Sequence, residues 1–176
     1  MFLGKRYLIE ERNVSNGSTA ENFPNVFDDA AALGYKNVLV EVEGLDESGS
    51  NIALRYYNSA GSLQSGNNYN HSYYRICNTD GNTYVQNVGA AHINRHYDAL
   101  WKSGNNCIIY FPNPTAANDT VSIITDMRFN AAFIGQHNSA ASMGGFRLYN
   151  DAGGNFTVTT TGSEYARIRV YGLEES

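Results

Sequence analysis

The chain has 176 residues, which is enough for one well-packed domain and too few for two of ordinary size. Hydrophobic residues make up 42% of the chain and 13 residues are tyrosines, so the composition excludes a wholly disordered protein. Charged residues make up only 16%, the net charge is −5, and Lys5–Arg6 is the only adjacent basic pair. Because binding to a phosphate backbone needs clustered positive charge, we expect no nucleic-acid partner.

Residues 1–30 differ in pattern from the rest of the chain. An apolar run, a polar stretch and a second apolar segment follow one another, which predicts an N-terminal arm that docks onto a neighbouring subunit. The interface residues expected on this arm are Tyr7, Ile9, Phe23, Val26 and Phe27. A short helix is predicted over residues 28–33, with Asp28 and Asp29 at its positive end and Gly34 as its C-terminal stop.

From residue 35 onward, side chains alternate in character with period two, which is typical of half-buried strands. The alternating segments are residues 38–43, 52–57, 69–76, 107–111, 121–128, 146–149, 156–159 and 165–171. Turn sequences rich in Asn, Asp and Gly separate them. The fold class predicted for residues 31–176 is therefore all-β, an antiparallel β-sandwich of the jelly-roll type. Residues 90–101 fit a strand or a short helix equally well.

Few residues suggest catalysis or metal binding. His92 and His96 have a spacing that would suit a metal on a helix, but Ile93 occupies the place where a zinc protease carries glutamate. Glu41 and Glu43 could form a carboxylate pair, yet charges that alternate with core valines usually lie on the wet face of a sheet. We therefore expect no enzyme activity, no metal and no cofactor.

The remaining compositional features exclude other classes of protein. No apolar stretch reaches 18 residues, so we expect no membrane partner, and the charged N-terminus does not have the pattern of a secretory signal. Cys77 and Cys107 each lie within an apolar or aromatic run, which favours buried thiols over a disulfide.

Several aromatic residues are candidates for contact with a partner. Tyr73, Tyr74 and Trp101 lie among polar residues, where exposed rings could stack on sugars. Tyrosine, tryptophan and arginine are also enriched at subunit interfaces, and we favour that interpretation. A carbohydrate-binding module for host-surface recognition remains the alternative.

The C-terminal strand resembles the ending of a module found in structural proteins of tailed-phage virions. That module typically closes with Leu-Tyr-Gly followed by an aliphatic residue, and here the chain reads Val170-Tyr171-Gly172-Leu173. The segments 35–42, 53–58, 66–69 and 107–114 resemble its earlier strands in the same order. The likeness spans about residues 35–173, but Arg167 and Arg169 stand where the family usually has small residues, which predicts a cationic sheet face for an acidic neighbour.

The resemblance implies a jelly-roll β-sandwich in fibres, spikes or capsid decorations, without enzyme activity. We accordingly expect a virion component, assembled in the host cytoplasm as a capsid decoration or a tail- or fibre-associated adaptor. Its expected partners are further copies of itself, with a trimer as the preferred homo-oligomer, and other virion proteins.

Overall fold

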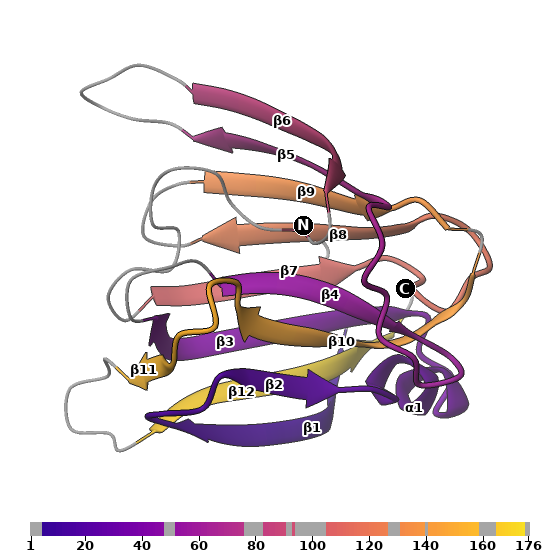
Figure 1. The fold of residues 1–176 in the computed structure, drawn as a ribbon. Coiled ribbons are helices and arrows are strands. Elements are labelled where there is room, and N and C mark those ends of the chain that lie inside the picture. Colours follow the sequence, from indigo (N-terminus) through magenta and orange to yellow (C-terminus); the bar gives the residue numbers. More distant parts are fainter. Residues whose placement is uncertain are drawn as a thin grey trace.

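The computed structural model describes residues 5–47, 52–75, 83–90, 93, 105–126, 131–139, 141–158 and 165–174. Within these ranges the protein is almost entirely strand, with one short helix (Figure 1). The elements are β1 Arg6–Ser15, β2 Ala20–Phe23, α1 Val26–Ala32, β3 Asn37–Glu47, β4 Ile52–Asn58, β5 Tyr69–Arg75, β6 Thr83–Ala90, β7 Asn105–Phe111, β8 Thr120–Asp126, β9 Ala131–His137, β10 Met143–Asn150, β11 Phe156–Val158 and β12 Tyr165–Leu173.

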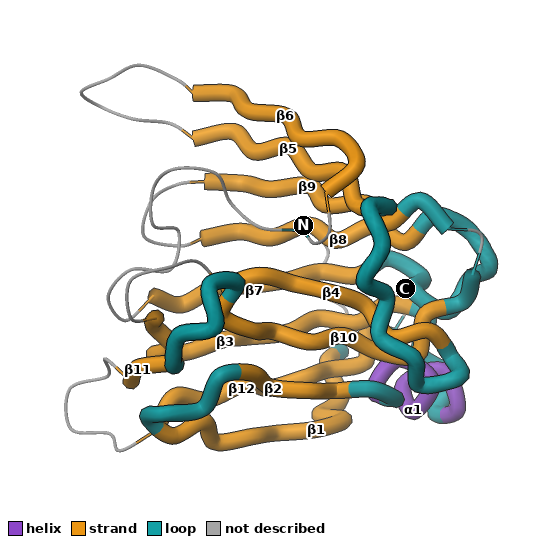
Figure 2. The backbone as a smooth tube through the Cα atoms, in the orientation of Figure 1, coloured by secondary structure: helices purple, strands orange, loops and turns teal. Residues whose placement is uncertain are grey.

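The described strands form two antiparallel sheets. The larger sheet has nine strands in the order β1-β12-β3-β7-β8-β9-β5-β6, with β11 also paired to β3. The smaller sheet has three strands in the order β2-β10-β4. Figure 2 shows the smaller sheet in front of the β12, β3 and β7 part of the larger one. The predicted all-β sandwich is confirmed, with its strands divided unevenly between the two layers.

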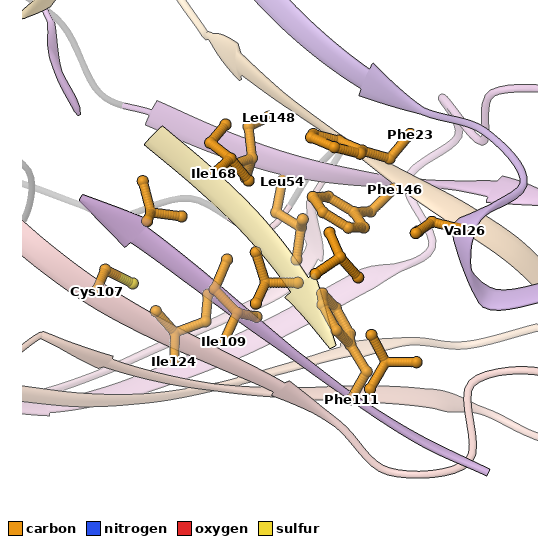
Figure 3. Packing of buried hydrophobic residues seen from close by; sticks show 14 of the residues in the cluster. Phe23, Val26, Leu54, Cys107, Ile109, Phe111, Ile124, Phe146, Leu148 and Ile168 are labelled. Atoms are coloured by element: carbon orange, nitrogen blue, oxygen red, sulfur yellow. The ribbon is translucent and has the colours of Figure 1, made fainter. Parts of the chain in front are cut away.

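The dry interior between the sheets comes from the period-two pattern. Val38, Val40 and Val42 of β3 are each at most 1% exposed, whereas Glu41 and Glu43, which project from the other face, are partly exposed. Figure 3 shows apolar side chains from both layers packed together, among them Leu54, Ile109, Phe146 and Ile168. Burial of a side chain of this kind stabilises the fold by about 1.5–3 kcal/mol before entropy is subtracted.

The predicted N-terminal arm is wrong for the described residues, because they belong to the body of the sandwich. β1 pairs with β12 from Arg6 to Ser15, and β2 pairs with β10. Phe23, Val26 and Phe27 are at most 1% exposed and lie in the core of their own chain. Burying these side chains needs no partner subunit, because strands of the same chain already cover them. The ring centroid of Phe23 lies 4.8 Å from that of Phe146 in β10, and the ring centroid of Phe27 lies 4.9 Å from that of Phe111 in β7.

The helix prediction is confirmed within two residues at its start. α1 ends at Ala32, and Gly34 adopts a φ of +89°, a conformation that glycine tolerates best. The Tyr35 N–H donates to the Ala30 carbonyl and the Gly34 N–H to the Ala31 carbonyl, both at 2.9 Å. This pair of bonds is the Schellman arrangement, which satisfies the last helical carbonyls.

Among the described strands from residue 35 onward, β6 and β9 were not predicted. In β9 an apolar residue such as Ile134 alternates with glycine and histidine, so neither face has a consistent character in the sequence. Of residues 90–101, Ala90 ends β6 and Ile93 forms an isolated bridge with Leu54. The other residues of that segment, with His92, His96 and Trp101, lie outside the described residues, as does Cys77.

Candidate functional site

Charged side chains form a paired ladder on the outer face of β1, β12 and β3. Arg169 lies directly between Glu11 and Glu41 in the strand register. Its guanidinium is 2.9 Å from Glu11, 3.7 Å from Glu41 and 3.5 Å from Glu43. Arg6 also pairs with Glu41. Partly exposed ion pairs contribute at most about 1 kcal/mol each, but a connected set also fixes strand register.

This ladder corrects the expectation of a cationic face for an acidic neighbour. Arg169 is neutralised by carboxylates of the adjacent strands, and Arg167 lies 3.9 Å from Glu11. Glu41 and Glu43 are the matching acids, so their carboxylates are engaged with arginines of the same sheet. The arrangement is that of a solvated sheet face held together by opposite charges.

An apolar row crosses the same outer face at right angles to the strands. Residues directly opposite one another in an antiparallel sheet project from the same face. The pairings Leu8–Tyr171, Tyr171–Leu39, Leu39–Tyr110, Tyr110–Ile123 and Ile123–Ile134 therefore place these side chains in one line, which we call the apolar row. Leu8 is 55% exposed, Ile123 38% and Ile134 53%, so the row reaches solvent at both ends.

The apolar row depends on which face of β8 is buried, because the inner face carries polar residues and the outer face carries Ile123. Ser122 is completely buried and Thr120 is 3% exposed, whereas Ile123 faces outward. Periodicity shows that Ser122 and Ile123 lie on opposite faces but does not say which face is inside. A row that crosses strands distant in sequence has no signature along the chain, so sequence reasoning missed it.

Polar and aromatic groups meet beneath the outer face, between β4, β5, β8 and β9. The His137 ring lies edge-on to Tyr69 with centroids 4.5 Å apart, and its side chain is fully buried. Neither ring nitrogen of His137 has a hydrogen-bond partner among the described residues. Burial lowers the pKa of His137 and raises the pKa values of Tyr56 and Tyr69, so all three groups are neutral at pH 7.

The smaller sheet carries a second group of charges on its outer face. Arg55 of β4 and Arg147 of β10 are direct partners in the strand register. Both guanidiniums lie against the Tyr149 ring, at 4.9 Å and 5.1 Å from its centroid. No motif in the sequence marked this pair.

The predicted interface residues are not gathered in one place. Tyr7 is 41% exposed and stacks on Tyr35 with ring centroids 5.0 Å apart, whereas Ile9 is half-buried against the core. Tyr73 and Tyr74 belong to β5, where their backbones pair with Phe133 and Ala132. The carbohydrate-binding alternative, which also needs Trp101, stays a prediction.

The described part of the chain has neither a metal-ligand cluster nor a membrane-spanning helix. In these ranges no three or more His, Cys, Asp or Glu side chains come together in a way that could hold a metal ion. None of the described helices is long and apolar enough to cross a membrane.

The fold and the outer face define an antiparallel β-sandwich with a charge-paired surface, crossed by an apolar row that is exposed at both ends and buried at Leu39. The chain matches no model of a known protein family. A search of curated proteins finds no relative at the significance level required.

Proposed function

We propose that this protein is a non-enzymatic structural component of a phage virion, a capsid decoration or a tail- or fibre-associated adaptor. It assembles as a homo-oligomer, with a trimer as the preferred state, and contacts neighbouring virion proteins. The single observation that carries the proposal is the apolar row, which presents Leu8, Ile123 and Ile134 to solvent on the outer face of the larger sheet.

An exposed apolar row on a sheet is a surface suited to association. Isolated exposed apolar side chains are ordinary, but contiguous ones bordered by polar groups mark contact sites. Here Ile123 and Ile134 are cross-strand neighbours, and the charged ladder of Arg169 and Glu41 borders the other half of the row. Covering the row with a partner removes apolar surface from water, which favours assembly.

The rest of the sandwich suits a structural component. The core is continuous from α1 through both sheets, and Arg12 closes one side by pairing with Glu10 at 2.6 Å and donating to the Asn22 carbonyl at 2.6 Å. The C-terminal strand contains the Tyr171-Gly172-Leu173 ending that resembles the phage module. A Cβ at Gly172 would lie 2.3 Å from the Tyr35 ring, so packing requires glycine at that position of the ending.

The oligomer is tested by measuring mass with light scattering over a range of concentrations. We expect wild type to associate and the double variant Ile123→Ser, Ile134→Ser to be monomeric while keeping its β-sheet circular dichroism. Leu33→Ser is the matched control, because Leu33 is 65% exposed at the end of α1, away from the apolar row, and its loss should leave the mass unchanged.

The virion role is tested separately by probing purified particles for this protein with a specific antibody and gold label. Labelling at regular positions on the capsid or tail supports the proposal. A wild-type protein that stays monomeric at every concentration would contradict the oligomer, and particles that lack the protein would contradict the virion role.

A further inference from the structure

β1 forms one edge of the larger sheet, at the bottom of the view in Figure 1. It pairs with β12 along Arg6–Ser15, and no other described strand pairs with it. An edge strand presents unpaired backbone N–H and C=O groups on its free side, and these groups can pair with a further strand. The free side of β1 is therefore able to accept another strand.

Among the described residues, the first half of this edge is the more open one. Arg12, in the second half, donates to the Asn22 carbonyl of β2 at 2.6 Å, and Val14 is 1% exposed. Residues 5–8 are all exposed, with Tyr7 at 41% and Leu8 at 55%. The accessible part of the edge therefore has apolar side chains at its centre and charged residues on either side.

This open half has a self-complementary sequence. Residues 5–11 read Lys-Arg-Tyr-Leu-Ile-Glu-Glu, with two basic residues, three apolar residues and two acidic residues in that order. When two copies of the segment run antiparallel, the basic end of each meets the acidic end of the other, and Leu8 meets Leu8. Cross-strand pairs of opposite charge or of apolar side chains are favourable, whereas like charges would repel. The segment therefore suits a second copy of itself.

A bulge in β1 keeps this match on one face of the sheet. The register with β12 shifts after Leu8, so that one extra residue lies between Leu8 and Glu11. Leu8 pairs with Tyr171 and Glu11 with Arg169, which both project from the outer face, and Arg6 lies on that face two residues before Leu8. In an antiparallel pair centred on Leu8, with the extra residue present in both copies, Arg6 of each copy lies opposite Glu11 of the other. Both members of the ion pair then project from the same face.

The apolar row and the charged ladder of the outer face both end at this edge. The apolar row ends at Leu8, and the ladder ends at Glu11, which lies 2.9 Å from Arg169. The side chains of Arg6 and Glu11 remain 39% and 40% exposed beside their partners in the same chain, so each has room for a second partner. A two-fold junction at Leu8 therefore continues the apolar row into the second copy and adds Arg6 of that copy to the ladder.

We propose that residues 5–11, at the start of β1, form a self-association edge, which pairs antiparallel with the same residues of a second copy about a two-fold axis beside Leu8. Backbone groups of the two free sides then join the larger sheets of the two copies into one continuous sheet. The inference rests on the proposed function for its partner, another copy of the chain. It adds a contact that is separate from the one at Ile123 and Ile134.

The edge contact is weak between single protomers. Residues 5–11 of each copy form a far smaller surface than the roughly 20–30 residues a side of a standard stable interface. Oligomers held together through Ile123 and Ile134 present one such edge per protomer, and edges that engage together strengthen one another. The edge therefore joins oligomers, and its detection between single protomers needs a method that captures short-lived contacts.

Disulfide trapping of Leu8→Cys in the full chain tests the contact. The variant is made together with Ile123→Ser and Ile134→Ser, so that a cross-link arises without the other proposed contact. Directly opposite residues have Cα atoms about 4.5–5.5 Å apart, which a disulfide spans, so we expect a dimer whose linked peptides both contain position 8. Asn13→Cys is the matched control, because Asn13 is exposed on the same strand but would lie about 30 Å from its counterpart in the second copy.

Charge reversal tests the register. Arg6→Glu and Glu11→Arg, each added to Leu8→Cys, place like charges opposite one another in a pair of identical copies, and we expect the yield of cross-linked dimer to fall about fivefold or more. An equal mixture of the two variants has opposite charges at both contacts of the mixed dimer, and we expect that dimer to recover the original yield. Damage to the ladder within one chain is not repaired by mixing, so recovery is specific to the contact between copies.

The outcomes separate this contact from the oligomer of the proposed function. Cross-linking at position 8, with recovery in the mixture, supports the edge contact even if no oligomer forms through Ile123 and Ile134. If Leu8→Cys links no better than Asn13→Cys, or if mixing restores nothing, the edge contact is overturned, and the oligomer is judged by its own light-scattering result. Should a charge variant fail to fold, the comparison of Leu8→Cys with Asn13→Cys decides.

Discussion

The Tyr69 hydroxyl connects the two sheets of the sandwich. It accepts a hydrogen bond from the Tyr56 backbone N–H of β4 at 3.0 Å and donates one to the Gln64 carbonyl at 3.0 Å. Tyr69 belongs to β5 of the larger sheet and Tyr56 to the smaller one, so one side chain satisfies a backbone N–H of the opposite layer and a carbonyl of the loop that follows β4. Both side chains are completely buried, and a water molecule has no direct access to replace the hydroxyl.

Tyr69→Phe should therefore destabilise the protein by about 1–3 kcal/mol, because the Tyr56 N–H is left buried without a partner. The measurement is the free energy of unfolding from urea denaturation. Tyr57→Phe is the control, since the Tyr57 hydroxyl bonds to Asn22 in an exposed setting, and its loss should change stability by no more than about 0.5 kcal/mol. Equal effects of the two changes would show that the Tyr69 hydroxyl does not connect the layers.

Phe27→Ala should destabilise the monomer by about 3–5 kcal/mol, because the ring fills the space between Phe111 and Phe146. Thermal unfolding at a concentration where the protein is monomeric measures the effect. Leu33→Ala at the exposed end of the helix should change stability by less than about 0.5 kcal/mol. If Phe27→Ala keeps the melting temperature of wild type but no longer forms the oligomer, the result would instead support the interpretation of this segment as an arm that docks onto a neighbouring subunit.

Stability should fall as the pH drops below about 6.5, through the buried imidazole of His137. Its folded-state pKa is lowered from 6.5 by burial, so the unfolded chain takes up a proton first as the pH falls. The contribution is present above 6.5 and is lost toward the lower folded pKa, with a slope of up to about 1.4 kcal/mol per pH unit.

The variant His137→Phe isolates this titration, because the aromatic contact with Tyr69 is retained and the proton site is removed. We expect the difference in unfolding free energy between variant and wild type to grow in favour of the variant from pH 7 to pH 5. All other ionisable groups are common to the two proteins, so their contributions cancel in the difference. A difference that does not change with pH would contradict the lowered pKa of His137 in the folded protein.

Strand positions could be predicted from the sequence wherever the alternation was strong. In β3 and β12, valines and isoleucines alternate with charged residues, and both strands lie where they were expected. The helix end at Gly34 was equally visible, because a positive φ at that point strongly favours glycine. β9 was missed because a strand whose inner face has glycine and histidine shows no clear apolar periodicity.

The candidate sites could not be predicted for a different reason. The ladder of Glu11, Arg169 and Glu41 joins three strands that are far apart in sequence, and so does the apolar row. Arg55 and Arg147 are likewise far apart in the sequence and become neighbours only through the pairing of β4 with β10. Local patterns contain no information on which strands will pair.

By itself, the sequence determined the fold class, the strand-rich composition and the absence of clustered basic charge, because these follow from residue type and local periodicity. Only the tertiary structure decided that the N-terminal segment belongs to the core, that Ile123 faces outward and Ser122 inward, and that two arginines meet on the smaller sheet. Those features depend on strand order and register, which are set by the packing of the whole sandwich rather than by any one segment.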